Sequence, residues 1–194
     1  MVDRGNRRSV VDKSRLPDQF PTHRHSAPFW EQLGRVVGTF GMLEEVLGKA
    51  IFVLTGTIRV DQATAPTELD HWEHALEKAL TDTLRPLIDS FGGFVRAHPG
   101  KTIVNLDDLL SDLRQASDLR NVLCHASWHP PDHLGRSKPL FVNKKFMAFD
   151  SPVDEEFLRK TQEHVAELVC EVVTTVTHMG YEFPGSDGPG KPVW

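Results

Sequence analysis

The chain has 194 residues, of which 39% are hydrophobic and 25% are charged, and its formal net charge is −5. This length is sufficient for one domain with a substantial hydrophobic core. No apolar run approaches the ~20 residues that a membrane-spanning helix needs. The negative charge excludes a globally basic nucleic-acid-binding protein, so contact with nucleic acid would have to depend on local patches.

The two ends of the chain differ from its middle. Residues 1–27 carry six basic and three acidic side chains and no apolar stretch, which predicts a basic N-terminal arm rather than a secretory signal. Residues 181–194 are rich in glycine and proline, which predicts a flexible C-terminal tail. Residues 28–180 form the predicted helical domain. Cys124 and Cys170 fall inside predicted helices, which argues against a disulfide framework and favours a cytoplasmic protein.

The first predicted helix covers residues 28–54. Its apolar residues recur at the three- and four-residue spacing of a helix that buries one stripe. Ser26 is the predicted N-cap. Glycine disfavours a helix, so we expect the glycines of this segment to allow close approach of a neighbouring helix; they are Gly34, Gly38, Gly41 and Gly48.

Three further helices follow. The second covers residues 67–95, and Pro86 should kink it or split it in two. The third begins at Asn105, a suitable N-cap, and continues through residues 120–125. The fourth covers residues 151–179, with Ser151 as the predicted cap.

An irregular stretch separates the last two helices. Its apolar residues 140–142 and 146–149 flank a polar turn, so they could form a hairpin. The predicted fold is therefore all-α: an antiparallel four-helix bundle, with up to five helices if the second one splits. A short hairpin or irregular insert lies between its last two helices.

Two charges fall within the apolar stripes. Arg120 lies in line with the buried positions of the third helix, and Glu44 lies in the stripe of the first. A charge in such a position is unfavourable unless it is paired, so the pattern suggests a Glu44–Arg120 ion pair between facing helices. If the pair is buried, its loss should destabilise the fold by ~3–5 kcal/mol. The alternative is that the stripes are wider and both side chains extend to solvent.

The residues that follow Arg120 include Asn121 and His125. Arginine binds phosphate bidentately, and histidine can carry a proton near neutral pH, so together they can cleave a phosphodiester without a metal. Five residues correspond to roughly 140° around a regular helix, so Arg120 and His125 cannot both face one ligand from it. Either the helix ends near Cys124 and His125 turns back, or a second copy of the chain completes the site.

This pattern resembles the HEPN superfamily. The signature of that family is an Arg, a polar residue and a His four to six residues after the Arg, and Arg120, Asn121 and His125 fill these places. The context is similar too, with a Phe-Gly-x-Leu-Glu run at residues 40–44, the motif at the end of the third helix and a long last helix. The resemblance covers residues 28–180.

The resemblance implies a metal-independent endoribonuclease without a cofactor, often a toxin or phage-defence effector of toxin–antitoxin type. It also implies a homodimer whose two motifs face one cleft, and an antitoxin or a nucleotidyltransferase as a partner protein. Some members have lost catalysis, so the alternative is an inactive HEPN-like module that binds nucleotides or proteins.

The chemistry fits these residues, because RNA carries its own nucleophile, the 2′-hydroxyl beside each phosphate. A histidine that removes or donates a proton supplies ~10²–10⁴-fold, and an arginine stabilises the charge that develops on the phosphoryl oxygens. Asn121 could orient His125 or contact the phosphate. Glu44 belongs to the candidate catalytic set through its expected pairing with Arg120.

Cations that follow the motif are candidates for gripping RNA phosphates; they are Arg136, Lys138, Lys144 and Lys145. The alternative for these four is a solvated hairpin. Two histidine pairs, at positions 23 and 25 and at 129 and 133, lack the Cys or carboxylate partners of a zinc site, so we expect no metal and solvated loop histidines. Trp30 and Trp128 are expected to be core residues rather than platforms for base stacking.

Overall fold

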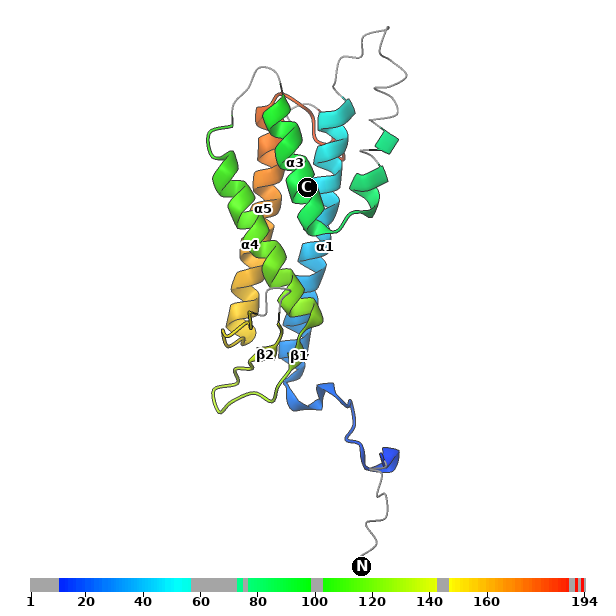
Figure 1. The fold of residues 1–194 in the computed structure, drawn as a ribbon, viewed down its shortest axis with the longest axis vertical. Coiled ribbons are helices and arrows are strands. Elements are labelled where there is room, and N and C mark those ends of the chain that lie inside the picture. Colours follow the sequence, from blue (N-terminus) through cyan, green and yellow to red (C-terminus); the bar gives the residue numbers. More distant parts are fainter. Residues whose placement is uncertain are drawn as a thin grey trace, which may run out of the picture.

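A computed structural model confirms the all-α helical bundle (Figure 1). It describes residues 11–56, 73–74, 77–98, 103–142, 147–188, 191 and 193. The long helices are α1 (Ala27–Gly56), α3 (Leu84–Ala97), α4 (Leu106–His125) and α5 (Glu155–His178). Short 3-10 helices precede them at η1 (Lys13–Arg15) and η2 (Thr22–Arg24), and the insert carries β1 (Ser127–Trp128) and β2 (Pro139–Leu140). In this described part of the chain, no helix has an apolar stretch long enough to cross a bilayer.

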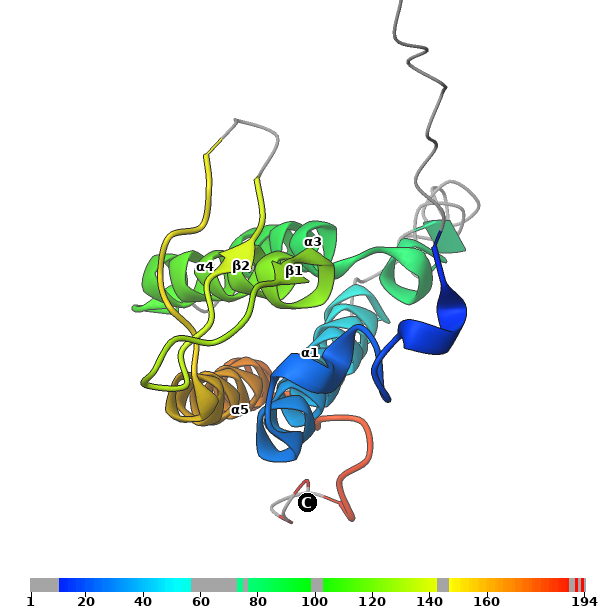
Figure 2. The same ribbon diagram turned by 90° about the horizontal axis from the view of Figure 1, so that it is seen from below.

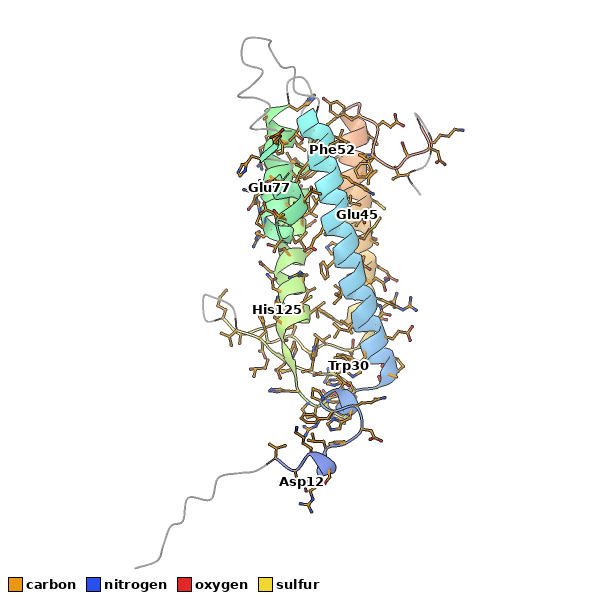
Figure 3. The ribbon with its side chains drawn as sticks, turned by 90° about the vertical axis from the view of Figure 1, so that its right-hand side faces the viewer. Asp12, Trp30, Glu45, Phe52, Glu77 and His125 are labelled. Carbon is orange, nitrogen blue, oxygen red and sulfur yellow. The ribbon has the colours of Figure 1, made fainter. Side chains whose placement is uncertain are left out.

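The long helices lie side by side along the long axis of the molecule. α4 runs opposite to α1, α3 and α5, so that α1 and α5 start at the end of the bundle where α4 stops (Figure 1). Seen from that end, α1 lies beside α5, and α3 with α4 lies across from them (Figure 2). The last residue of α4, His125, therefore lies towards the end of the bundle at which α1 begins (Figure 3).

The core lies between the apolar stripes of these helices. The stripe of α1 packs on α5 and α3, as its helical periodicity predicts. The largest fully buried side chains are Phe40, Phe91, Phe183, Leu43, Leu47, Ile51, Leu84, Leu87, Ile88, Leu110, Leu113 and Leu158.

The N-terminus of α1 has the cap that the sequence predicts. The hydroxyl of Ser26 accepts a hydrogen bond from the backbone N–H of Phe29 at 3.2 Å. The same hydroxyl donates to the carboxylate of Glu155 at 2.6 Å. Ser26 therefore ties the first turn of α1 to the first turn of α5.

The predicted second helix is divided, which was one of the two expectations for Pro86. Residues 77–81 are helical, residues 82–83 are not, and α3 begins at Leu84. Pro86 thus lies in the first turn of α3, where backbone N–H groups have no intrahelical acceptor and a missing donor costs nothing. Much of the first half of the predicted helix lies outside the described residues.

The predicted start of the last helix was wrong. The N-cap is Asp154, whose side chain accepts from the N–H of Phe157 at 2.8 Å, rather than Ser151. The backbone of Val153 is extended because it exchanges two 2.8 Å hydrogen bonds with Ser137 in the insert. Because of this pairing between distant residues, the helix begins at Glu155, which the local sequence does not indicate.

The expectation for the α1 glycines was wrong at three of four positions. A Cβ at Gly34, Gly38 or Gly41 would meet nothing within 4 Å, whereas a Cβ at Gly48 would lie 3.2 Å from the carbonyl oxygen of Ala79. The tightest helix approach at a glycine lies elsewhere, where a Cβ on Gly92 of α3 would lie 2.6 Å from the Leu110 side chain of α4.

The insert is extended and pairs with itself. β1 and β2 are antiparallel, and a further bridge joins Val142 to Ala148, as the predicted hairpin requires. Its turn, with Lys144 and Lys145, lies outside the described residues.

The start of the predicted C-terminal tail belongs to the bundle. Phe183 is only 2% exposed and joins the hydrophobic core. The hydroxyl of Tyr181 is hydrogen-bonded to the ring of His98 just after α3. The packed part of the chain therefore continues beyond residue 180 to Phe183, because burial of this aromatic side chain stabilises the segment, and Val193 also packs against the core.

Candidate functional site

The candidate site is built on the last two turns of α4. Val122 and Leu123 are buried and fix this end of the helix against the bundle. Helical bonding continues past the motif, because the N–H of Ala126 donates to the carbonyl of Val122 at 2.9 Å. His125 is therefore the last residue of a regular helix, and it is exposed.

Arg120 and Glu44 lie together, as their positions in the two apolar stripes predict. A guanidinium nitrogen of Arg120 is 3.7 Å from the Oε1 atom of Glu44, and the two side chains are 26% and 29% exposed. Oε1 is itself buried and has no hydrogen-bond partner among the described residues. The contact is thus an ion pair without a hydrogen bond, and the pair is half-buried rather than fully buried.

Asn121 and His125 lie one turn apart on α4, so their side chains share one face of the helix. Asn121 is half-buried and His125 is exposed. Since the helix does not end at Cys124, five regular helical steps separate His125 from Arg120, and their side chains leave α4 about 140° apart. This removes the first alternative for the motif, in which His125 turns back towards Arg120.

Two of the cations proposed to grip RNA are paired with carboxylates inside the insert. Arg136 binds the Oδ2 atom of Asp132 through two guanidinium nitrogens, at 3.0 and 3.1 Å. Lys138 is 2.7 Å from the carboxylate of Asp150. All four charged groups are on the surface. Each carboxylate therefore reduces the positive potential of its cation, while the cation remains accessible to solvent.

The same contacts lower the pKa of both carboxyls. The pKa of Asp132 lies below its ordinary value, mainly because the backbone N–H of Arg136 hydrogen-bonds to it, with help from Leu134 and the Arg136 guanidinium. The hydrogen bond from Lys138 lowers the pKa of Asp150. Both carboxylates therefore stay ionised, and the described part of the insert provides few unpaired positive charges beside the motif.

An aromatic cluster, formed by His25, Phe29, Trp30 and Trp128, packs next to the motif. His25 stacks on Phe29 with ring centroids 4.5 Å apart, and Trp128 meets Phe29 edge-on at 5.1 Å. The indole N–H of Trp30 donates to the carbonyl of Thr22 at 2.8 Å. Trp30 and Trp128 are thus packing residues, as predicted, and Figure 3 shows Trp30 and His125 towards the same end of the bundle.

The expectation of solvated histidines was wrong for His25. Burial among the aromatic rings lowers its pKa, and its Nε2 atom is buried without a hydrogen-bond partner in the described part of the chain. The signal in the sequence was the proximity of His25 to Phe29 and Trp30, but the contact with Trp128 depends on the fold. His129 and His133 are exposed. Within the described ranges, no three His, Cys, Asp or Glu side chains gather to hold a metal ion.

Chemically, the end of α4 offers three groups. They are the guanidinium of Arg120, which is paired with Glu44, the amide of Asn121 and the exposed imidazole of His125. These groups can bind an anion and transfer a proton, but one copy of α4 directs them to two sides. Comparisons with protein-family models, with curated proteins and with solved structures find no match to this chain.

Proposed function

We propose that the chain is a metal-independent endoribonuclease of the HEPN type, which binds RNA through Arg120, Asn121 and His125. One observation carries the proposal. The ion pair with Glu44 holds the Arg120 side chain at a position that is about one quarter exposed, five residues before an exposed histidine at a helix end. A charge inside an apolar stripe is unfavourable, and a binding function for that charge explains its presence.

In the proposed reaction, the imidazole of His125 takes the proton of a 2′-hydroxyl, whose oxygen then attacks the adjacent phosphorus. The bond from phosphorus to the 5′-oxygen breaks, the leaving oxygen takes a proton from water, and a 2′,3′-cyclic phosphate and a 5′-hydroxyl result, while His125 returns its proton to solvent. Arg120 stabilises the negative charge that develops on the phosphoryl oxygens. Asn121, one turn before His125, orients the imidazole or binds the phosphate.

The proposal includes a homodimer. Because α4 is regular through His125, Arg120 and His125 of one copy diverge, and a two-fold axis beside this end of α4 would bring Arg120 of one copy towards His125 of the other. In this arrangement the insert would line the cleft. Arg136 and Lys138 would then contribute the positive charge that their ion pairs leave available for RNA. Lys144 and Lys145 lie outside the described residues and remain candidate contacts to RNA on their charge alone. The cellular role we infer is that of a cytoplasmic toxin or phage-defence effector, controlled by an antitoxin or a nucleotidyltransferase.

A second candidate function is an inactive HEPN-like module that binds a nucleotide or a protein partner. The pairing of Arg136 with Asp132 and of Lys138 with Asp150 favours it, because these contacts neutralise two of the expected RNA-binding cations. The net charge of −5 also disfavours binding of a long polyanion.

The deciding experiment is cleavage of single-stranded RNA in the presence of EDTA. We expect fragments that end in a 2′,3′-cyclic phosphate, and we expect His125→Ala to reduce the rate by ~10²-fold or more. His164→Ala is the matched control, since His164 is an exposed histidine on α5, outside the site. Equal rates for wild type and His125→Ala would exclude His125 as the proton-transfer group. Absence of cleavage, together with binding of RNA or a nucleotide, would favour the inactive module.

The shared cleft has its own test. Mixing Arg120→Ala with His125→Ala should restore about a quarter of wild-type activity, because half of randomly assorted dimers are mixed and each has one intact site. No recovery in a sample shown to exchange subunits would place both residues of a site on one copy.

A further inference from the structure

One face of α1 is lined by glycines and charges and is not covered by the rest of the described structure. At 100° per residue, its members fall within about 120° of the helix circumference. They are Glu31, Gly34, Arg35, Gly38, Gly41, Glu45 and Lys49, and this set is called the α1 outer face below. The same sector also contains Met42, which is partly buried and packs against the core. Its glycines are exposed, and a Cβ at Gly34, Gly38 or Gly41 would touch nothing within 4 Å.

Nothing in the described part of one copy explains these three glycines. Glycine is a poor helix former, and none of the three has the positive φ that would require it. Gly48 and Gly92, by contrast, lie where another segment approaches closely. A glycine on an exposed helix face does allow the backbone of another helix to come near, so the three positions suit contact with a helix outside this chain's own bundle.

The charges of the α1 outer face indicate which helix this is. Along the chain they alternate as acid, base, acid, base, and each acid pairs with the base four residues later. Glu31 is 2.7 Å from Arg35, and Glu45 is 2.7 Å from Lys49. The order is self-complementary about residue 40, so an antiparallel copy of α1 would place Glu31 opposite the partner's Lys49 and Arg35 opposite the partner's Glu45. A parallel copy would instead place like charges opposite one another.

We propose that the α1 outer face is a self-association surface, on which α1 of a second copy packs antiparallel with its centre near Gly38 and Gly41. The four charges then form two kinds of intermolecular pair, each occurring twice because of the two-fold axis. The intrahelical pairs already orient the side chains along this face, so little further ordering is needed.

This surface is separate from the cleft proposed at the end of α4. Glu44, which contacts Arg120, lies about 120° around α1 from Gly38. Packing on the α1 outer face therefore leaves the motif open, and the proposal does not depend on RNA cleavage. A chain with both two-fold surfaces can form a tetramer or a longer assembly instead of only a dimer.

The size of the contact sets its expected strength. From residue 31 to residue 49, α1 is about 27 Å long, and a helix is about 10 Å wide, so the contact covers roughly 300 Å² per copy. A standard stable interface buries about 800 Å² per partner. We therefore expect weak association, with a dissociation constant on the order of tens of micromolar.

The sharpest test is a charge-swapped variant that carries Glu31→Lys, Arg35→Glu, Glu45→Lys and Lys49→Glu. It keeps the spacing of the pairs within α1 and remains complementary to itself, but it presents like charges to the wild-type face. Energy transfer between labelled copies at about 100 µM, above the expected dissociation constant, should be strong for wild type with wild type and for variant with variant. It should fall clearly for wild type mixed with variant, even if the α4 cleft also dimerises. Equal transfer in all three samples, or none in any, would overturn the proposal.

A glycine variant gives an independent measurement. Gly38→Leu and the matched control Gly93→Leu both replace an exposed helical glycine whose Cβ would meet nothing within 4 Å, the control being on α3. Both should raise the melting temperature of the dilute protein by about 2–4 °C, because leucine favours a helix. Only Gly38→Leu should weaken association, by about tenfold or more, because it fills the space that a second α1 would enter. Unchanged association of Gly38→Leu would refute the packing mode, and RNA cleavage by either variant would report separately on the motif.

Discussion

The ion pair between Glu44 and Arg120 can be tested by a double-mutant cycle with Glu44→Gln, Arg120→Gln and the double variant. At the observed 3.7 Å, two unit charges attract by about 1 kcal/mol in water and about 4 kcal/mol at an effective dielectric constant of ~20. The pair is about one quarter exposed and has no hydrogen bond, so solvent screens it and desolvation offsets part of the attraction. We expect a coupling energy of about 1–2 kcal/mol, below the ~3–5 kcal/mol that full burial would give.

The assay is chemical denaturation of the four proteins, with the free energies of unfolding combined in the cycle. Arg114 and Asp89 provide the control cycle, since they also join α4 to a neighbouring helix, at 2.7 Å, but are 40% and 55% exposed. That coupling should stay below about 1 kcal/mol and decline more in 1 M salt. A Glu44–Arg120 coupling no larger than that of the control would refute the argument that Glu44 positions the guanidinium.

Three further predictions concern the fold around the site. Burial lowers the pKa of His25 from its ordinary value of 6.5, so its contribution to stability is full above that pH and is lost as the pH falls below it. Tryptophan fluorescence should report a loosening of the cluster on acidification below that pH, which His25→Phe reduces and His133→Phe does not. Gly92→Ala should destabilise the bundle by about 1–3 kcal/mol because the new methyl group crowds Leu110. Gly93→Ala should stabilise it by about 0.5–1 kcal/mol because its Cβ meets no other atom. Equal effects of the two variants in thermal melts would contradict the packing described. Phe183→Ala should destabilise the fold by about 3–5 kcal/mol, whereas Leu134→Ala, at an exposed position, should have almost no effect. A nearly neutral Phe183→Ala would mean that the segment after α5 is not part of the core.

The sequence was sufficient wherever the decisive interaction is local or repeats along a helix. Ser26 caps α1 as expected, because an N-cap depends on the next three residues. The Glu44–Arg120 contact was also foreseeable, because each charge interrupts an apolar stripe and the two stripes face one another.

Prediction failed where partners are distant in the chain. The start of α5 moved because Val153 pairs with Ser137, and His25 is packed because Trp128 reaches it from the insert. The glycines at positions 34, 38 and 41 were correctly recognised as unusual, but the helix they were expected to admit is absent from the described bundle. The periodicity of a sequence shows which residues share a helix face, but it does not show which part of the molecule covers that face.

The short link between the motif and the aromatic cluster has a mechanical consequence. Only two residues separate His125 from Trp128, so the backbones of these two residues are at most about 10–11 Å apart. Trp128 is in turn packed against Phe29 and His25. The last turn of α4 is therefore on a short tether whose far end is anchored on the N-terminal segment. A ligand that pulls His125 outward therefore also pulls on the packing of Trp128, and a change that releases His25 removes one of the two ring contacts that hold Trp128 in place.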